Sequence, residues 1–282
     1  MKQIGIIGAG TMGAGIAQVA LLSGFSVTIY DVAETVLSTL RYRIRSDFSL
    51  LAQKGKLATE QIDPLLSNLS ATNSLSNFSN CDFIIEAAAE VLDIKQGIFK
   101  HLEVNSPAAC IFASNTSSLS ITEIAGAIKN RGRFVGLHFF NPATRMKLVE
   151  VVKGFHTSYE TLQLAFSLVK QFGKTPILVK DTPGFIVNRI ARPFYGEALR
   201  LYQEGVADID AIDKIVRLEG GFKMGPFELM DLIGIDINFT VTKSIYEQSF
   251  HESRYRPHLI QQMMVNAGQL GKKTGRGFYK YK

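Results

Sequence analysis

The sequence predicts a doubly wound α/β domain followed by an all-α carboxyl-terminal domain. Short apolar runs alternate with longer helical patterns as far as residue 180, which is the order typical of a parallel sheet with crossover helices. A glycine-rich turn, GAGTMG (8–13), joins the first apolar run to the first helical pattern. Beyond DTPGF (181–185), runs of strand length stop and only helical patterns follow.

The apolar runs of strand length are expected to form one sheet. They are IGIIG (4–8), SVTIYD (26–31), CDFIIEAA (81–88), ACIFAS (109–114), RFVGLHFF (133–140), MKLVEVV (146–152) and TPILVKD (175–181). Helical patterns lie between them over residues 11–24, 33–54, 92–103 and 159–172. Helices of this length suit the crossovers of a doubly wound sheet.

The second domain is expected to be helical throughout. Its helical patterns cover residues 184–204, 208–218, 226–248, with a break near Gly234, and 255–268. Because proline suits the first turn of a helix, Pro183 marks the predicted boundary. The predicted domains are therefore residues 1–183, which would bind a dinucleotide, and residues 184–282.

The composition narrows the classes of protein that the chain could belong to. Hydrophobic residues make up 46% of the 282 residues, and no apolar stretch approaches the roughly 18 to 20 residues of a membrane span. Glycines interrupt the apolar run after Lys2, so this run does not read as a signal peptide. Cys81 and Cys110 are too few for a disulfide scaffold and lack the spacing of metal ligands. We expect a soluble, cytoplasmic protein with no metal site.

The formal charge of +6 is compatible with several kinds of ligand. The basic residues are scattered, apart from the clusters RYRIR (41–45) and GKKTGR (271–276), and no nucleic-acid-binding motif accompanies them. We therefore expect a phosphate-rich small molecule as the partner, with no nucleic acid and no membrane.

The glycine turn predicts a Rossmann-type dinucleotide site. Gly8 would take the tight turn after the strand, Gly10 would let the backbone approach a pyrophosphate, and Gly13 would allow close packing of helix and strand. Asp31 ends the second strand 18 residues after Gly13, where an acid accepts hydrogen bonds from the adenosine ribose. An acid at this position disfavours a 2′-phosphate, which predicts NAD over NADP. Asp31 could instead be an ordinary capping acid.

Two polar residues are expected on otherwise apolar strands. His138 alternates with Phe134, Gly136 and Phe140, and Glu150 shares its strand face with apolar neighbours. A buried carboxylate needs a partner, and an imidazolium would supply one. The pair would then serve as a general base with its orienting acid. A structural histidine and a solvent-facing edge glutamate remain the alternatives.

Ser117 and Asn188 are further candidates at the edge of the predicted site. Ser117 lies in SNTSSLSIT (114–122), directly after a strand, whereas Ser118 and Ser120 are better explained as helix caps. Asn188 falls early in the helix after Pro183, where it could face a cleft or satisfy the helix end. No hydrolase motif and no metal-ligand spacing is present.

Together the motifs resemble the L-3-hydroxyacyl-CoA dehydrogenase family over nearly the whole chain and in the family's order. The matching segments are GAGTMGAGIAQ, EAAAEVLDIK, SNTSSL, GLHFFNP, MKLVEVV, KDTPGFIVNR, MGPFELMDLIGID and GKKTGRGFYKY. GLHFFNP and DTPGFIVNR are far more specific than the glycine turn. The chain length resembles bacterial members that act on 3-hydroxybutyryl-CoA more than the larger fused proteins of β-oxidation.

The resemblance implies NAD-dependent, reversible oxidation of a short-chain (S)-3-hydroxyacyl-CoA, in fatty-acid or butanoate metabolism. It assigns His138 as the catalytic base, Glu150 as its partner, and Ser117 and Asn188 as donors to the substrate oxygen. It also implies that the helical domain binds substrate and forms a homodimer. The cofactor-contacting positions that it implies, besides Gly8, Gly10, Gly13 and Asp31, are Glu90, Lys95, Ser117, Asn141 and Lys273, and Lys54 falls near the coenzyme A phosphate site.

The chain departs from the family pattern at three positions and leaves two rival functions open. Val91 stands where many members have Asn, and Thr144 and Arg145 replace a proline and an aliphatic residue. Arg145 bears on acyl-chain or phosphate contacts more than on the type of reaction. The rivals are a non-catalytic NAD-binding protein and a β-hydroxyacid dehydrogenase, although HFFNP argues against the second.

Overall fold

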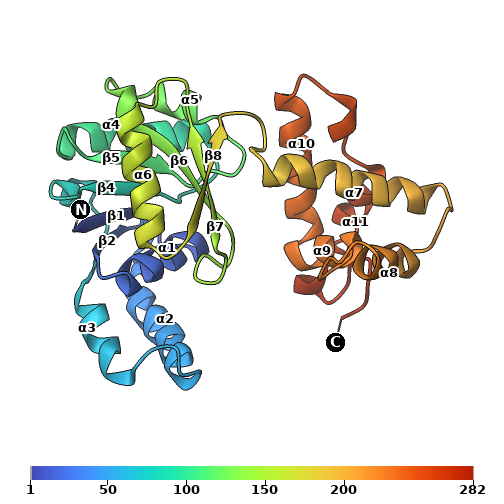
Figure 1. Cartoon of the computed structure of the whole chain (residues 1–282), viewed down its shortest axis with the longest axis horizontal. Coiled ribbons are helices and arrows are strands. Elements are labelled where there is room, and N and C mark those ends of the chain that lie inside the picture. The colour runs from blue at the N-terminus through green and yellow to red at the C-terminus, as the bar shows by residue number, and fades with distance from the viewer. Residues whose placement is uncertain (1, 282) are drawn as a thin grey trace. The chain divides into compact units, whose positions relative to one another are not determined.

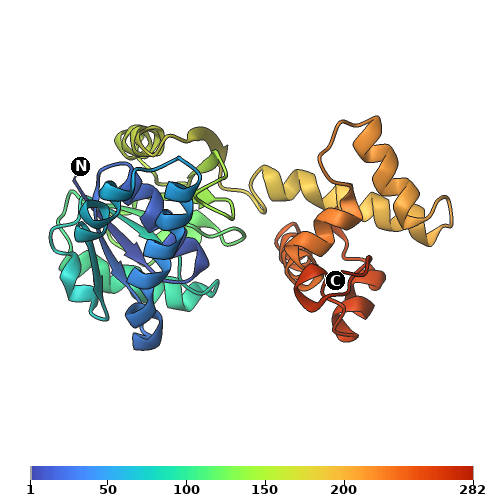
Figure 2. The ribbon, with the colours of Figure 1, turned by 90° about the horizontal axis from the view of Figure 1, so that it is seen from below.

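The computed structural model describes residues 2–281, and these divide into two compact units, with the boundary between Thr182 and Pro183. Figures 1 and 2 show that the first unit is a sheet with helices on both sides and that the second consists of helices. The predicted fold class, a doubly wound α/β sheet followed by an all-α domain, is confirmed.

The sheet of the first unit has the strand order β3-β2-β1-β4-β5-β6-β7-β8. Strands β1 to β6 are parallel to one another, β7 is antiparallel to β6, and β8 is parallel to β7. The strand order reverses between β1 and β4, so the carboxyl ends of these strands form the edge at which doubly wound folds bind ligands. The strands are β1 (Gln3–Ile7), β2 (Ser26–Tyr30), β3 (Leu69–Thr72), β4 (Phe83–Glu86), β5 (Ile111–Ser114), β6 (Phe134–Phe139), β7 (Leu148–Lys153) and β8 (Thr175–Lys180).

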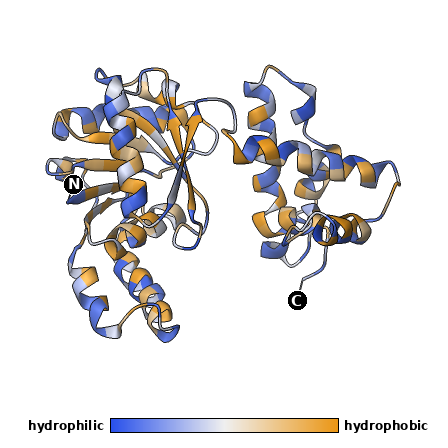
Figure 3. Ribbon diagram, in the orientation of Figure 1, coloured by the Kyte–Doolittle hydropathy of each residue, from blue (hydrophilic) through white to orange (hydrophobic). Residues whose placement is uncertain are grey.

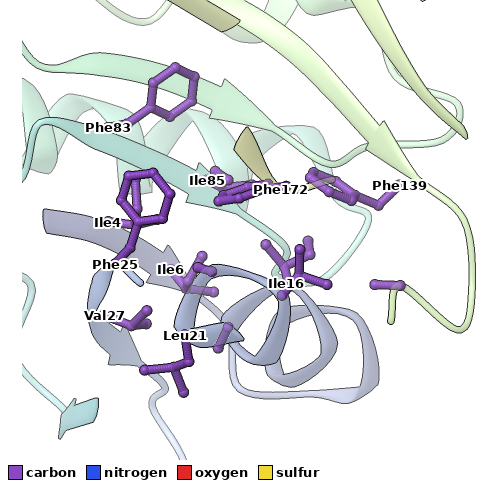
Figure 4. Packing of buried hydrophobic residues seen from close by; sticks show 14 of the residues in the cluster. Ile4, Ile6, Ile16, Leu21, Phe25, Val27, Phe83, Ile85, Phe139 and Phe172 are labelled. Carbon is purple, nitrogen blue, oxygen red and sulfur yellow. The ribbon is translucent and has the colours of Figure 1, made fainter. Parts of the chain in front are cut away.

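Apolar side chains cover both faces of the sheet, as parallel strands with helices on each side require. Figure 3 shows that the strands of the first unit are mainly hydrophobic. On one face Ile4 and Ile6 of β1 pack with Ile16 and Phe172 (Figure 4). On the other face the Phe99 ring lies 5.6 Å from that of Phe112 and 4.6 Å from that of Phe134. The helices that cover the sheet are α1 (Thr11–Leu22), α2 (Glu34–Gln53), α4 (Leu92–Asn105) and α6 (Tyr159–Gln171).

Three short elements, α3, β3 and α5, lie outside the helical and strand ranges predicted from the sequence. Helix α3 (Ile62–Ser67) leads into the edge strand β3, and helix α5 (Ile121–Ala125) begins at the end of the SNTSSLSIT segment (114–122). Elements of four to six residues span less than two helical turns or carry few alternations, so their periodicity is weak. Ser120 is the N-cap of α5 and accepts a hydrogen bond from the Glu123 N–H at 3.3 Å, in agreement with the capping role predicted for it.

The second unit contains five α-helices among its described residues. The predicted break at Gly234, where φ is 102°, separates α9 from α10. The last helix begins at Leu259 rather than near 255, because Pro257 disfavours helical backbone at the residue before it. The helices are α7 (Val187–Gln203), α8 (Ile209–Leu218), α9 (Pro226–Ile233), α10 (Ile235–Gln248) and α11 (Leu259–Asn266).

Two buried aspartates anchor the GKKTGRGFYKY segment within the second unit. Asp231 accepts hydrogen bonds from the N–H groups of Phe278 and Tyr279, each at 2.9 Å. Asp213 accepts one from the Tyr279 hydroxyl, also at 2.9 Å. A Cβ at Gly277 would lie 2.1 Å from an Asp231 carboxylate oxygen, so only glycine fits there. This motif therefore has a structural role in the helical unit.

Candidate active site

The glycine turn lies at the carboxyl end of β1, where the strand order reverses. Gly8 has a φ of 97°, a conformation that residues other than glycine rarely adopt. A Cβ there would lie 2.6 Å from the Ala87 carbonyl oxygen, and a Cβ at Gly13 would lie 1.8 Å from the carbonyl oxygen of Gly8. Both positions therefore require glycine for the close packing of turn, strand and helix.

Gly10 has different surroundings. A Cβ built there meets nothing within 4 Å, so the space over the turn is open. Gly10 is also the N-cap of α1 and, as glycine, has no side chain to cover the first N–H groups of that helix. Open space beside a helix N-terminus fits the pyrophosphate of a dinucleotide.

Asp31 is held against the glycine turn. Its carboxylate accepts hydrogen bonds from the N–H groups of Ala9 at 2.8 Å and Ala33 at 3.0 Å. A carboxylate has about four acceptor positions, so two such bonds leave capacity for ribose hydroxyls. Arg43 of α2 donates a hydrogen bond to the Ala9 carbonyl oxygen at 2.7 Å. Asp31 therefore makes capping-type contacts and is also placed where a ribose would be recognised.

The structure brings His138 and Glu150 together. They are direct partners in the antiparallel register of β6 and β7, and the imidazole Nδ1 lies 2.6 Å from the Glu150 Oε2. The side chains are only 8% and 1% exposed, so the interaction takes place away from bulk water. A hydrogen bond to a carboxylate at Nδ1 fixes the orientation of the ring and stabilises its imidazolium form.

The pair lies at the same edge of the sheet as the glycine turn, because β6 is parallel to β5 and β7 begins where β6 ends. The Phe140 ring packs beside the imidazole of His138, with 4.5 Å between the two ring centroids. The Asn115 Oδ1 accepts a hydrogen bond from the Phe139 N–H at 2.8 Å. This bond ties the end of β6 to the segment that carries Ser117.

Ser117 lies in the turn after β5, and Glu90 organises this turn. The Glu90 Oε1 accepts hydrogen bonds from the N–H groups of Ser117 at 2.9 Å and Ser118 at 3.2 Å, and from the Thr116 hydroxyl at 2.5 Å. Burial alone would raise the pKa of Glu90, but the charge of Lys95 and these hydrogen bonds outweigh it, so this pKa lies below its ordinary value. The carboxylate is therefore ionised at neutral pH.

Lys95 is 1% exposed and lies between two carboxylates. Its Nζ is 2.6 Å from the Glu86 Oε1 and 3.2 Å from the Glu90 Oε2. The predicted cofactor contacts Glu90 and Lys95 are thus paired with each other, and contact of either with the cofactor remains a prediction.

A basic groove of about 900 Å³ runs between α1, α2 and the segment 141–145. Lys54, the predicted phosphate-binding residue, lines it, and so do Arg145 and Asn141. Among the described lining residues, Asp47 is the one carboxylate, and it accepts a hydrogen bond from Gln18 at 2.7 Å. The cationic side chains of the groove are Arg43, Lys54, Lys56 and Arg145.

Two predicted site residues lie in the second unit. Asn188 is in the first turn of α7, where its carbonyl oxygen accepts a hydrogen bond from the Arg192 Nε at 3.2 Å. The Lys273 Nζ lies 2.7 Å from the Asp236 Oδ2. The roles of Asn188 towards substrate and of Lys273 towards cofactor remain predictions.

Glu86, which is fully buried at the end of β4, is not among the site residues predicted from the sequence. The available signal was an acid inside the apolar run FIIEAAA with a lysine nine residues later. The described residues contain no group of three or more histidine, cysteine, aspartate or glutamate side chains arranged to hold a metal ion. Within residues 2–281, none of the helices is both long enough and apolar enough to span a bilayer.

A glycine turn at the reversal of strand order and a buried histidine–carboxylate pair at the same edge are typical of nicotinamide-dependent oxidoreductases. Residues 3–182 match the family model described as "3-hydroxyacyl-CoA dehydrogenase, NAD binding domain", and residues 184–281 match the model of the same family's C-terminal domain. The chain belongs to the 3-hydroxyacyl-CoA dehydrogenase family, and its first unit is the NAD-binding domain.

Individual relatives agree with this family. The chain is 44% identical to the 3-hydroxyadipyl-CoA dehydrogenase of Escherichia coli, matching all of this chain but only 59% of the relative's length. It is 41% identical to a probable 3-hydroxybutyryl-CoA dehydrogenase of Deinococcus radiodurans over 99% of this chain and 100% of the relative. The crystal structure of (S)-3-hydroxybutyryl-CoA dehydrogenase from Ralstonia eutropha superposes with a TM-score of 0.96 at 39% identity, covering 100% and 99% of the two chains.

Proposed function

We propose that the protein catalyses the reversible, NAD-dependent oxidation of (S)-3-hydroxyacyl-CoA to 3-oxoacyl-CoA, with a short acyl chain such as that of 3-hydroxybutyryl-CoA. The observation that carries the proposal is the contact of 2.6 Å between His138 and Glu150 at the ligand-binding edge of the sheet. Two of the relatives described above are named for 3-hydroxybutyryl-CoA, which supports the short chain.

In the proposed mechanism His138 moves the proton of the 3-hydroxyl group. With Nδ1 directed to Glu150, the other ring nitrogen, Nε2, accepts this proton as the C3–H bond breaks. Glu150 holds the ring and stabilises the imidazolium that forms, while Ser117 and Asn188 donate to the oxygen on which charge develops. NAD, when bound, supplies the acceptor for the hydride from C3. In the reverse reaction His138 returns the proton as a general acid.

The experiment that tests the proposal is NADH oxidation in the presence of acetoacetyl-CoA, a longer 3-oxoacyl-CoA, or the free acid acetoacetate. We expect turnover with the thioesters and none with the free acid. NADH binding without turnover of any of them would favour a non-catalytic protein, and turnover of the free acid would favour a β-hydroxyacid dehydrogenase. The ratio of the two thioester rates gives the chain-length preference.

Asp31 leads to a prediction about cofactor choice. A 2′-phosphate would bring a second negative charge next to this carboxylate, which is fixed by two backbone N–H groups and cannot easily turn away. We expect kcat/KM for NADH to exceed that for NADPH by at least about tenfold. A preference for NADPH in parallel steady-state assays would overturn the role given to Asp31.

We propose that the basic groove binds the phosphates of coenzyme A, since four cationic side chains line it. Lys54→Ala or Arg145→Ala is expected to raise KM for acetoacetyl-CoA by about fivefold, the order of one exposed ion pair. KM for acetoacetyl-pantetheine, which lacks the nucleotide phosphates, should not change. Lys100→Ala, at an exposed position on α4, is the matched control. Equal effects on both thioesters would contradict the assignment.

We further propose a cytoplasmic homodimer that associates through the helical unit. Large apolar side chains of the MGPFELMDLIGIDI segment (224–237) are exposed, among them Leu232 (52%), Ile233 (38%) and Ile237 (50%), and such side chains suit a protein interface. Light scattering at micromolar protein should give twice the chain mass, and a monomer mass would count against the dimer.

The two cysteines support the proposed cytoplasmic location. Burial raises the pKa of the Cys81 and Cys110 thiols to about 12, which suits unreactive thiols in a reducing compartment.

A further inference from the structure

The buried carboxylate Glu86 has no part in the mechanism described above, yet it lies at the carboxyl end of β4, in the middle of the ligand-binding edge. We infer that Glu86 is a positioning residue for the dehydrogenase reaction and that it acts through Lys95 and Glu90 on Ser117. This inference rests on the proposed function, because Ser117 matters only if it donates to the substrate oxygen.

Glu86 uses both carboxylate oxygens. Its Oε1 accepts hydrogen bonds from the Lys95 Nζ and from the Ala88 N–H, each at 2.6 Å. Its Oε2 accepts one from the Ser114 hydroxyl at 2.5 Å. The single side chain thus joins three segments, namely the end of β4, helix α4 and the end of β5.

Burial makes these contacts difficult to replace. Glu86 is 0% exposed and Lys95 is 1% exposed, and a buried charge without a partner is strongly unfavourable. Without the carboxylate of Glu86, the Lys95 ammonium would retain only the longer contact of 3.2 Å to Glu90. The lysine would then have to reorient or draw Glu90 inward, and either change would disturb the groups that Glu90 holds.

The groups held by Glu90 form the turn that carries Ser117. The Glu90 Oε1 accepts from the Ser117 N–H at 2.9 Å, and its distance to the Ser117 hydroxyl oxygen is 3.5 Å. A second route leads to the same turn, because the Ser114 hydroxyl that contacts Glu86 also accepts from the Thr116 N–H at 3.3 Å. Glu86 therefore supports the turn by two routes, one through Ser114 and the other through Lys95 and Glu90.

A double-mutant cycle tests whether Glu86 acts through Ser117. Glu86→Gln alone is expected to lower kcat for acetoacetyl-CoA reduction by about tenfold to 100-fold, the order of a small misplacement of a reacting group. In the Ser117→Ala background the same change should lower kcat by less than about twofold, because the hydroxyl group that Glu86 positions is absent. Equal losses in both backgrounds, or unchanged kcat in the single variant, would overturn the inference.

The matched control is Glu103→Gln at the other end of α4. Glu103 also accepts hydrogen bonds from backbone N–H groups, those of Lys129 at 2.9 Å and Asn130 at 3.1 Å. These contacts lie next to the amino end of β6, away from the ligand-binding edge. We expect this variant to keep the wild-type kcat, and a loss equal to that of Glu86→Gln would count against a specific role for Glu86.

A milder variant covers the case in which Glu86→Gln does not fold, as shown by its melting curve. Ser114→Ala keeps both buried charges and removes only the hydroxyl between Glu86 and the turn. It should lower kcat by about threefold to tenfold, again with less than about twofold effect in the Ser117→Ala background. Additive losses would overturn the inference. An inactive wild-type protein would instead refute the proposed function.

Discussion

Replacing His138 with glutamine is expected to lower kcat for acetoacetyl-CoA reduction by about 10²- to 10⁴-fold, the usual contribution of general acid–base catalysis. Glutamine keeps a polar side chain of similar reach but cannot exchange a proton at neutral pH. The imidazole is 8% exposed and has its Nδ1 at 2.6 Å from Glu150, so water cannot easily substitute for it. Steady-state rates at saturating NADH and thioester measure the loss.

A matched histidine distinguishes loss of the proton carrier from general damage. His101 is exposed on α4, and His101→Gln should leave kcat within about twofold of wild type. Tight NADH binding by His138→Gln, measured by fluorescence, would show that the cofactor site is intact. If kcat of His138→Gln falls by less than about threefold, the histidine is not the acid–base catalyst.

The second large effect is expected from Glu150→Gln. Glutamine occupies nearly the same volume, so β7 and its neighbours can keep their packing, but the charge that stabilises the imidazolium is lost. Because Glu150 is 1% exposed, solvent does not screen that charge, and we expect kcat to fall by about 100-fold or more. Circular dichroism and a melting curve should remain close to wild type.

A double variant that combines His138→Gln with Glu150→Gln tests whether the two residues act together. If Glu150 acts by orienting and stabilising His138, Glu150→Gln should lower kcat only slightly in a protein that already carries His138→Gln. Additive losses in the double variant would mean that Glu150 acts independently of the imidazole. Turnover of Glu150→Gln at the wild-type rate would refute the pairing altogether.

Much of the fold follows from local patterns. The alternation of apolar runs and helical segments predicts the doubly wound sheet, and the positions of Gly8, Gly10 and Gly13 predict the turn at its edge. These signals are strong because each depends on neighbouring residues. Alternation along each strand also predicts that His138 and Glu150 point to apolar surroundings, before any pairing of strands is known.

Other features depend on pairing between distant segments, which periodicity does not report. The register that sets His138 opposite Glu150 requires β7 to run antiparallel to β6, against the parallel order of the strands before it. The short elements α3 and β3 give weak patterns. The ion pairs of Lys95 with Glu86 and Glu90 form only when α4 packs beside β4, so sequence periodicity does not reveal them.

A single-turnover measurement tests most directly whether His138 transfers the proton during hydride transfer. Wild type and His138→Gln, each with NADH bound, are mixed with excess acetoacetyl-CoA, and the loss of reduced-nicotinamide absorbance is followed. We expect both proteins to bind the thioester with similar affinity and the absorbance to fall at least about 100-fold more slowly in the variant. Equal rates would contradict the claim that proton transfer through His138 accompanies hydride transfer.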